Sequence, residues 1–434
     1  MSHPIVIAGG TVVDQLSERN VDLLVVDGII AATGDPGSLD GQGEHLDASD
    51  AFVIPGLVDI QVHFRTPGGE ESEDITSGAA GAARGGVTAC VMMPNTVPTI
   101  DNVEIVSDVL SLARHAPCDV RTSAAISIDR AGERLVDFPE LHRVGVRVFT
   151  DDGWVVDDAE LMEAALRKSA ELPGTVISQH AEHSEMVAGG VINQGAVAER
   201  LGLPGRPREA ESVIVERDIA LAARTGGRYH VLHMSTSMAT QQVRQAQGSG
   251  IRVTAEVTPQ HLILTENDVE RLGSSGKMNP PLRLEEDVAA LRSALFDGTI
   301  NAIATDHAPH HPDLKNVGLA DAPPGMLGVE TLASVVWNAL VDPGLMSRQR
   351  FVAATSSGPA RIAGIAEHGQ ALTEGNFANI AIFDPAEEWV IDASALQSKS
   401  TNTPWHGDRL VGRVRHTVCR GDLVVHQGEL VNQN

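Results

Sequence analysis

Residues 52–68 read FVIPGLVDIQVHFRTPG, and this stretch decides the fold class. It is an apolar run from Phe52 to His63 that ends in polar side chains, which predicts a buried strand carrying those side chains at its carboxyl end. Residues two apart on a strand face the same side, so Gln61 and His63 are expected to point together into the fold.

The chain repeats this unit. Seven further strand-like runs end in polar residues, at 87–95, 120–127, 144–152, 175–180, 229–236, 253–261 and 302–310. Between them lie helical patterns such as residues 157–172 and 209–225, with apolar side chains at i, i+3, i+4 and i+7. Eight such alternations over roughly 250 residues predict an α/β fold of the (β/α)8 TIM-like barrel type.

The two flanks read differently. Residues before 52 form short β-like runs with Gly and Asp turns, and residues 379–425 repeat that texture. We therefore expect a small, discontinuous β-sandwich formed by the N- and C-terminal segments, residues 1–51 and 366–434, beside a barrel at residues 52–365. Two separate β caps are the alternative.

Bulk properties exclude several classes of protein. A net charge of −26 over 434 residues argues against nucleic acid, which requires a basic footprint. The start lacks the pattern of a signal peptide, and no apolar run approaches the ~20 residues of a membrane span. We expect a cytoplasmic protein with no membrane partner. Cys90, Cys118 and Cys419 form no CxxC pair, so they are expected to be buried thiols rather than zinc ligands or disulfides.

Chemistry is expected at the strand ends, because barrels of this type build their active sites there. The polar residues at these ends are Gln61, His63, Asp151, Asp152, His180, His233, Asp306 and His307. A single histidine is more often a core or surface residue, but imidazoles and carboxylates from five strand ends converge on one barrel mouth. Such a nitrogen and oxygen donor set suits zinc or a similar divalent ion.

These motifs resemble those of dihydroorotases, a branch of the amidohydrolase superfamily. Residues 55–68 resemble the first-strand motif of that family, in which Asp-x-His-x-His precedes Arg-x-Pro-Gly. Further matching segments follow in family order: GGVTACVMMPNTVP (85–98), VFTDDG (148–153), QHAE (179–182), YHVLHMSTS (229–237), VTAEVTPQHLIL (253–264), KMNPPLR (277–283), ATDHAPH (304–310) and STNTPWHGDRLVGRVRHTVCRG (400–421). The resemblance covers nearly the whole chain.

The resemblance implies a ligand set for one or two zinc ions, consisting of His63, Asp152, His180, His233 and Asp306. Many amidohydrolases bridge two metals with a carboxylated lysine on strand 4, but none of the four lysines ends that strand here. Asp152 occupies the matching place, as in the bacterial branch that uses aspartate. Its neighbour Asp151 is expected to point the other way. Asp306 is the implied catalytic acid and base.

Gln61 is a departure from the family pattern, since it stands where the first histidine of the pair belongs. A neutral amide oxygen is a poorer zinc ligand than an imidazole. The metal position shared with His63 and Asp306 is therefore expected to bind more weakly, which puts a binuclear site in doubt. Thr66 replaces a glutamate that is common in the family, a milder departure.

The implied substrate contacts are Arg65, Asn95, Asn279 and His310. A planar guanidinium suits a carboxylate, so Arg65 is the first choice to bind a small anionic substrate. The asparagines could instead be loop or capping residues. Residues 310–327, rich in Pro, Gly and polar residues, read equally as a lid over the site or as a passive surface loop.

The implied reaction is the reversible cyclisation of N-carbamoyl-L-aspartate to L-dihydroorotate in pyrimidine synthesis. A hydantoinase or allantoinase is a second interpretation, which Arg65 disfavours because allantoin has no carboxylate. A non-catalytic dihydroorotase-like subunit that partners aspartate transcarbamoylase is a third, supported by Gln61. The sequence leaves open a homodimer and the need for a partner subunit.

Overall fold

The computed structural model describes residues 3–431 and contains a barrel of eight parallel strands. Its strands, in chain order, are β8 (Leu57–Val62), β9 (Val87–Met92), β10 (Asp119–Thr122), β11 (Val148–Phe149), β12 (Val176–Gln179), β15 (Tyr229–Val231), β16 (Val253–Val257) and β17 (Ala302–Ile303). They form sheets of three and five strands, which the parallel bridges Val62–His307 and Ala124–Phe149 join into a closed barrel. The predicted fold class is confirmed.

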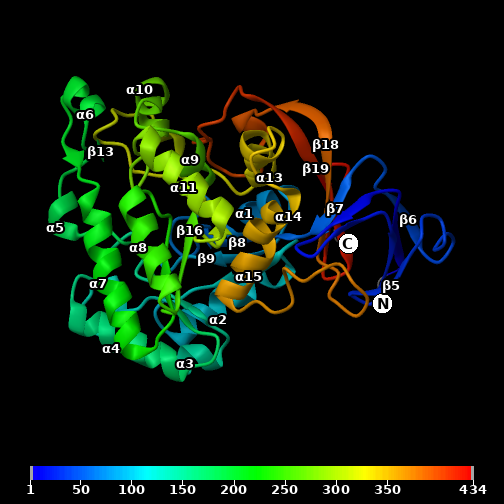
Figure 1. Ribbon diagram of the computed structural model, residues 1–434, viewed down its shortest axis with the longest axis horizontal. Helices are drawn as coiled ribbons and strands as arrows, with labels where there is room; N and C mark the ends of the chain where they lie inside the picture. Colours follow the sequence, from blue (N-terminus) through cyan, green and yellow to red (C-terminus); the bar gives the residue numbers. More distant parts are fainter. Residues whose placement is uncertain (1–2, 432–434) are drawn as a thin grey trace.

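A helix follows each barrel strand and packs on its outside (Figure 1). These helices are α1 (Ile75–Arg84), α2 (Val103–Leu112), α3 (Phe138–Arg143), α4 (Ala159–Glu171), α7 (Glu209–Thr225), α8 (Ser237–Gly248), α11 (Glu285–Asp297) and α13 (Leu332–Val336). Helix α4 illustrates why they form. The Asp158 carboxylate accepts hydrogen bonds from the first free amides, and Met162, Ala165, Leu166 and Ser169 make its buried stripe.

The two ends of the chain meet in a β-sandwich beside the barrel, where β5, β6 and β7 lie next to β18 and β19 (Figure 1). One sheet has the order β5-β4-β1-β6 and the other β21-β20-β19-β18-β7-β2-β3. The N-terminal strands are β1 (Ile5–Ala8), β2 (Thr11–Val13), β3 (Glu18–Arg19), β4 (Asp22–Val26), β5 (Ile29–Gly34), β6 (Glu44–Asp47) and β7 (Phe52–Pro55). The C-terminal strands are β18 (Ile380–Val390), β19 (Arg409–Cys419), β20 (Asp422–His426) and β21 (Glu429–Leu430).

One hydrophobic cluster holds the sandwich together and includes Ile7 and Leu23 from the first segment and Ile380 and Val418 from the last. Burial of such side chains contributes about 1.5–3 kcal/mol each, so neither segment would retain this core alone. The predicted joint sandwich is thereby confirmed, against two separate caps. The division at residues 51 and 366 stays a prediction, and β7, directly after residue 51, pairs within the sandwich.

Three local details differ from the sequence-based expectations. The run from residue 52 to residue 63 is two strands, since β7 ends before Gly56 and β8 begins after it. A side chain at Gly56 would lie 2.3 Å from Thr88, so the chain turns there at a point of close approach. His261 lies in the short helix α9 (Pro259–Ile263) instead of at the end of a strand, and β18 is one long, bulged strand from Ile380 to Val390 instead of a short run.

The three cysteines are buried and free, as expected. Within residues 3–431, no helix combines the length and hydrophobicity that crossing a bilayer requires.

Candidate active site

A cavity of about 220 Å³ lies at the carboxyl ends of the barrel strands. It is lined by His63, Arg65, Asn95, Asp152, Gly153, His180, His233, Asn279, Asp306, Ala308, His310, Pro324 and Gly325. Nine of the ten predicted site residues are among them, drawn from strand ends more than 240 residues apart in sequence. The tenth, Gln61, is fully buried and contacts Asp152 from behind the cavity wall.

The histidines and aspartates form two ligand groups that share Asp152. Asp152, His180 and His233 make one group, and His63, Asp152 and Asp306 make the other, each with its donor atoms within 4.8 Å of one another. In the first, His180 Nδ1 lies 3.0 Å from His233 Nε2, and Asp152 Oδ1 lies 3.4 Å from His233 Nε2. In the second, His63 Nε2 lies 2.9 Å from Asp306 Oδ1 and 3.4 Å from Asp152 Oδ2. Imidazole nitrogens and carboxylate oxygens in this arrangement fit a divalent cation.

The outer ring nitrogens of two histidines are held by neighbouring side chains. His63 Nδ1 lies 2.8 Å from Asn95 Oδ1, which can only accept, so Nδ1 carries a proton and Nε2 is directed toward the Asp306 and Asp152 carboxylates. His180 Nε2 lies 3.2 Å from Glu182 Oε2 and is fixed by the same logic, with Nδ1 toward the site. Partners of this kind orient metal-binding histidines and raise their basicity.

The electrostatics of the first ligand group favour positive charge. Burial raises the pKa of Asp152, but hydrogen bonds from His180 and His233 and the nearby His63 hold it well below its ordinary value. Burial lowers the pKa of His180, but Asp152 and Glu182 together raise it to about 9. A divalent cation placed between these atoms would take over the role of the proton that the two carboxylates hold on His180.

Gln61 reaches the shared carboxylate through its amide nitrogen. Nε2 donates to Asp152 Oδ1 at 3.3 Å, while Oε1 is buried and has no partner in the described part of the chain. A buried oxygen without a donor is costly, typically about 1–3 kcal/mol. Gln61 and His63 both contact Asp152, as the alternation along the strand predicted.

The neighbouring aspartates of the DDG turn point in different directions. Asp151 accepts hydrogen bonds from the backbone of Ile126 and Ser127 and from the Ser127 hydroxyl, away from the histidines. Burial raises its pKa. Asp152 therefore faces the cavity, and Asp151 ties this turn to the preceding loop.

All four predicted substrate residues face the cavity. Arg65 Nε donates to the Pro309 carbonyl at 3.2 Å, and burial lowers the pKa of its guanidinium to about 10, which still leaves it charged at neutral pH. His310 Nε2 donates to the Pro324 carbonyl at 2.8 Å, and burial together with the charge of Arg65 lowers its pKa to about 3. His310 is therefore neutral, and Arg65 supplies the positive charge.

Three residues that line the cavity have left-handed backbone conformations, which non-glycine residues adopt rarely. The φ angles are 54° at Arg65, 30° at His233 and 49° at Asp306. Each costs of order 1–3 kcal/mol and persists only where the surroundings hold it. The sharp turns direct the side chains from the strand ends into the cavity.

The chain matches known proteins over nearly its full length. The family model described as "Dihydro-orotase-like" matches residues 51–239. The chain is 39% identical to the dihydroorotase of Trichlorobacter lovleyi, covering 97% of this chain and 99% of that protein. It is 40% identical to the dihydroorotase of Streptomyces coelicolor, over 94% and 96% of the two chains.

The chain belongs to the dihydroorotase family. Solved structures of similar fold include the L-hydantoinase of Arthrobacter aurescens, with a TM-score of 0.89, 25% identity and coverage of 100% and 98%. The dihydropyrimidinase of Brevibacillus agri, at 24% identity and a TM-score of 0.86, covers 99% of this chain and is itself covered to 96%. The fold is thus common to cyclic amidohydrolases, whereas the higher identities are to dihydroorotases.

Sequence reasoning missed a charged cluster behind His180 in this dihydroorotase-family chain. Glu182 Oε2 accepts from Arg206 Nη1 at 3.0 Å, and Glu182 Oε1 lies 3.3 Å from Arg283 Nη2. Arg206 also donates to Asn279 Oδ1, so the cluster connects His180 with Asn279 across the cavity wall. A signal was present in QHAE, because Glu182 lies two residues beyond His180.

Two of the four lysines hold the stretch at 310–327. Lys315 Nζ donates to the carbonyls of Pro323 at 2.9 Å and Gly325 at 3.2 Å, and Lys277 Nζ donates to Ala320 at 2.8 Å. Pro324 and Gly325 line the cavity, so this stretch forms part of its wall. The lid stays a prediction.

Proposed function

We propose that the protein is a zinc-dependent dihydroorotase that interconverts N-carbamoyl-L-aspartate and L-dihydroorotate. One observation carries the proposal: two ligand groups that share Asp152 face the same cavity as the half-buried, charged Arg65. Family membership supports the same reaction.

The three-residue group of Asp152, His180 and His233 would hold the first zinc ion, and His63, Asp152 and Asp306 would hold a second. When bound, zinc lowers the pKa of a water molecule and polarises a carbonyl group. Gln61 would weaken the second position, because it offers only an amide oxygen. We therefore propose one firmly bound zinc ion per chain and a second, weaker site.

Asp306 moves the proton in the proposed reaction. In the hydrolytic direction its carboxylate takes a proton from the attacking water and returns it to the ring nitrogen as the amide bond breaks. His63 Nε2, 2.9 Å from Asp306 Oδ1, holds that carboxylate in place. Arg65 and Asn95 bind the substrate carboxylate, so that the amide carbonyl lies toward the ligand groups.

The hydantoinase alternative requires a substrate without a carboxylate. Such a substrate would leave the half-buried Arg65 guanidinium without the substrate carboxylate that it would otherwise bind, so the ligand would lose that ion pair. We therefore expect dihydroorotate to be preferred over hydantoin and over dihydrouracil by kcat/KM.

The test is dihydroorotate hydrolysis by zinc-reconstituted protein, followed by loss of ultraviolet absorbance, with Asp306→Ala as the inactive control. Turnover by the wild type alone supports the proposal and shows that Gln61 is tolerated. If neither protein turns over, the assay is repeated with aspartate transcarbamoylase. Activity that appears only then indicates a partner-dependent enzyme, and continued inactivity favours the non-catalytic subunit.

A cytoplasmic location, a homodimer and an association with aspartate transcarbamoylase stay predictions. Gel filtration with light scattering, with and without aspartate transcarbamoylase, measures both assemblies directly.

A further inference from the structure

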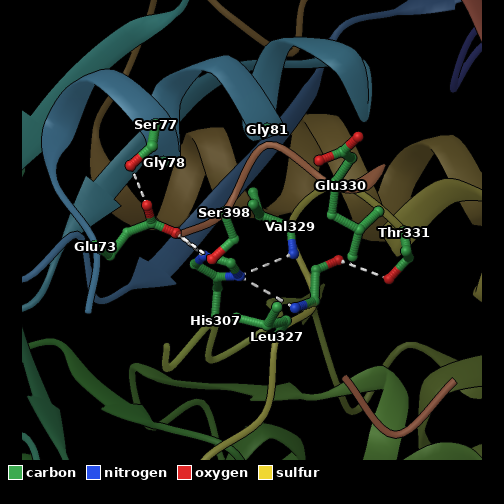
Figure 2. A pocket seen from close by; sticks show the side chains of 12 residues that line it. Glu73, Ser77, Gly78, Gly81, His307, Leu327, Val329, Glu330, Thr331 and Ser398 are labelled. Carbon is green, nitrogen blue, oxygen red and sulfur yellow. Dashed lines mark hydrogen bonds and ion pairs between the residues drawn. The ribbon is translucent and has the colours of Figure 1, made fainter. Parts of the chain in front are cut away.

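His307, the residue after Asp306, is fixed in one tautomer by a buried network (Figure 2). Its Nδ1 accepts hydrogen bonds from the backbone amides of Gly328 at 3.1 Å and Val329 at 3.4 Å. Backbone amides only donate, so the ring proton must be on Nε2. That nitrogen lies 3.4 Å from Glu73 Oε2 and points its proton at the carboxylate.

Glu73 is completely buried and receives donors from two distant parts of the chain. The Ser77 hydroxyl of α1 and the Ser398 hydroxyl both donate to it, and the Lys399 amide approaches to 3.4 Å. Burial raises the pKa of Glu73, but His307, Ser398 and Ser77 bring it below its ordinary value. Glu73 is therefore an ionised carboxylate at the centre of the network.

The network also fixes the backbone around Asp306, because His307 makes two further hydrogen bonds through its own backbone. The His307 amide donates to Thr305 Oγ1 at 3.1 Å, and its carbonyl accepts from the His63 amide at 2.9 Å. Asp306 lies between these anchors with φ of 49°. This conformation persists only if the neighbouring residues are held.

Residues 398–402, which follow the barrel in sequence, also contact the loop that comes after His307. Asn402 Nδ2 donates to the carbonyls of Ala308 and Gly325, both at 3.0 Å. Asn402 Oδ1 accepts from the His310 amide at 3.1 Å. This short segment thus makes two contacts. Ser398 contacts Glu73, and Asn402 contacts the loop that carries His310.

We propose that Glu73 and Asn402 are positioning residues for the reaction proposed above: Glu73 holds Asp306 through His307, and Asn402 holds His310. Neither side chain lines the cavity. The inference rests on the proposed function for its kinetic consequences, but its structural part is independent of turnover.

The first test compares Glu73→Ala with the conservative Glu73→Gln. Glu73→Ala removes the acceptor of the His307 Nε2 proton, so His307 and the neighbouring Asp306 should shift. A displacement of Asp306 by up to about 1 Å should lower kcat by roughly 10²-fold. KM for dihydroorotate should change little, because Arg65 and Asn95 are untouched. Glu73→Gln keeps an oxygen for the His307 proton and should recover most of kcat.

Glu330→Ala is the matched control. Glu330 and Glu73 line one small pocket, which is separate from the active-site cavity, and Figure 2 draws no interaction between Glu330 and His307. Glu330 contacts Arg84 and the Gln397 amide instead. Its variant should keep kcat per folded molecule. Equal losses of kcat in both alanine variants, or no rescue by glutamine, would overturn the role of Glu73.

The second test applies to Asn402→Ala, which should raise KM roughly tenfold with a smaller change in kcat, since it frees His310 and not Asp306. Asn379→Ala is its control, because Asn379 is a buried asparagine that also bridges backbone groups, at Glu367 and Arg420, away from the cavity. A similar KM in the two variants would refute the role of Asn402.

Crystal structures of Glu73→Ala and wild type separate this inference from the proposed function. We expect Asp306 to leave its left-handed conformation, or the His63–Asp306 pair to open beyond hydrogen-bond distance, in the variant alone. An unchanged pair overturns the inference even if the wild type is active. If the wild type is inactive but Asp306 is displaced in the variant, the proposed function is refuted and the structural role of Glu73 still holds.

Discussion

Replacing Glu182 by glutamine should weaken both the fold and zinc binding. The Glu182 carboxylate is buried and contacts His180 Nε2 at 3.2 Å, Arg206 Nη1 at 3.0 Å and Arg283 Nη2 at 3.3 Å. Glutamine has nearly the same shape, but it removes the charge that all three partners face.

The size of the effect can be worked out in two ways. Burial raises the pKa of Glu182, but His180, Arg283 and Arg206 lower it from 4.5 to about 2, which corresponds to about 3 kcal/mol of stability at neutral pH. Removing one partner of a buried ion pair costs about 3–5 kcal/mol. Arg283 retains the nearby charge of Glu211, which places the expected loss at the lower end, about 3 kcal/mol.

Zinc affinity should fall as well, by roughly 10- to 100-fold, because Glu182 orients a proposed ligand. The assays are urea unfolding at pH 7 and zinc competition against a chelator.

Since the pKa of Glu182 is lowered on folding, the stability that Glu182 contributes is present above pH 4.5 and is lost as the pH falls toward about 2. The stability difference between wild type and variant should shrink over that interval.

Glu286→Gln is the control, because Glu286 also pairs with an arginine, Arg208 Nη1 at 2.6 Å, but its side chain is 65% exposed. Exposed pairs contribute at most about 1 kcal/mol. Equal destabilisation by the two substitutions, or an unchanged zinc affinity in Glu182→Gln, would refute the reasoning.

Three further substitutions test the site and its surroundings. Arg65→Gln removes the charge facing the substrate carboxylate and should raise KM for dihydroorotate by roughly 10- to 100-fold in steady-state assays, with little change expected for a carboxylate-free amide; an unchanged KM contradicts the assignment. Gln61→His supplies an imidazole at the weaker position, so metal analysis after dialysis should find more zinc per chain than in wild type, and equal content argues against that position. Burial raises the pKa of Glu330 to about 7, so the folded protein holds this proton and loses stability as the pH rises from 4.5 through 7. Glu330→Gln lacks that loss and should be more stable than wild type by up to about 3 kcal/mol at pH 8 and equal near pH 4.5 in thermal unfolding, whereas a pH-independent difference would contradict the assignment.

The alternation of strand and helix patterns was sufficient to predict the barrel and to place the main candidates at its mouth. Parallel strands of a closed barrel all end on one face, so polar residues at successive strand ends must meet there. That rule brought His63, Asp152, His180, His233 and Asp306 together without knowledge of any distance. Alternation also separated Asp152 from Asp151, because neighbouring residues point to opposite sides.

The sequence by itself thus determined the fold class and the strand ends that carry the polar side chains, since these follow from local periodicity and from the order of motifs along the chain. It left one sandwich or two caps open, and the shared hydrophobic cluster of the two flanks decided for one sandwich. Only the tertiary structure decided that Glu73 meets Ser398, that Glu182 meets Arg283, and that Asp306 adopts φ of 49°. Those contacts join residues about 100 to 325 positions apart. Their distances are set by how helices and loops pack around the barrel, and no pattern within a single strand or helix contains that information.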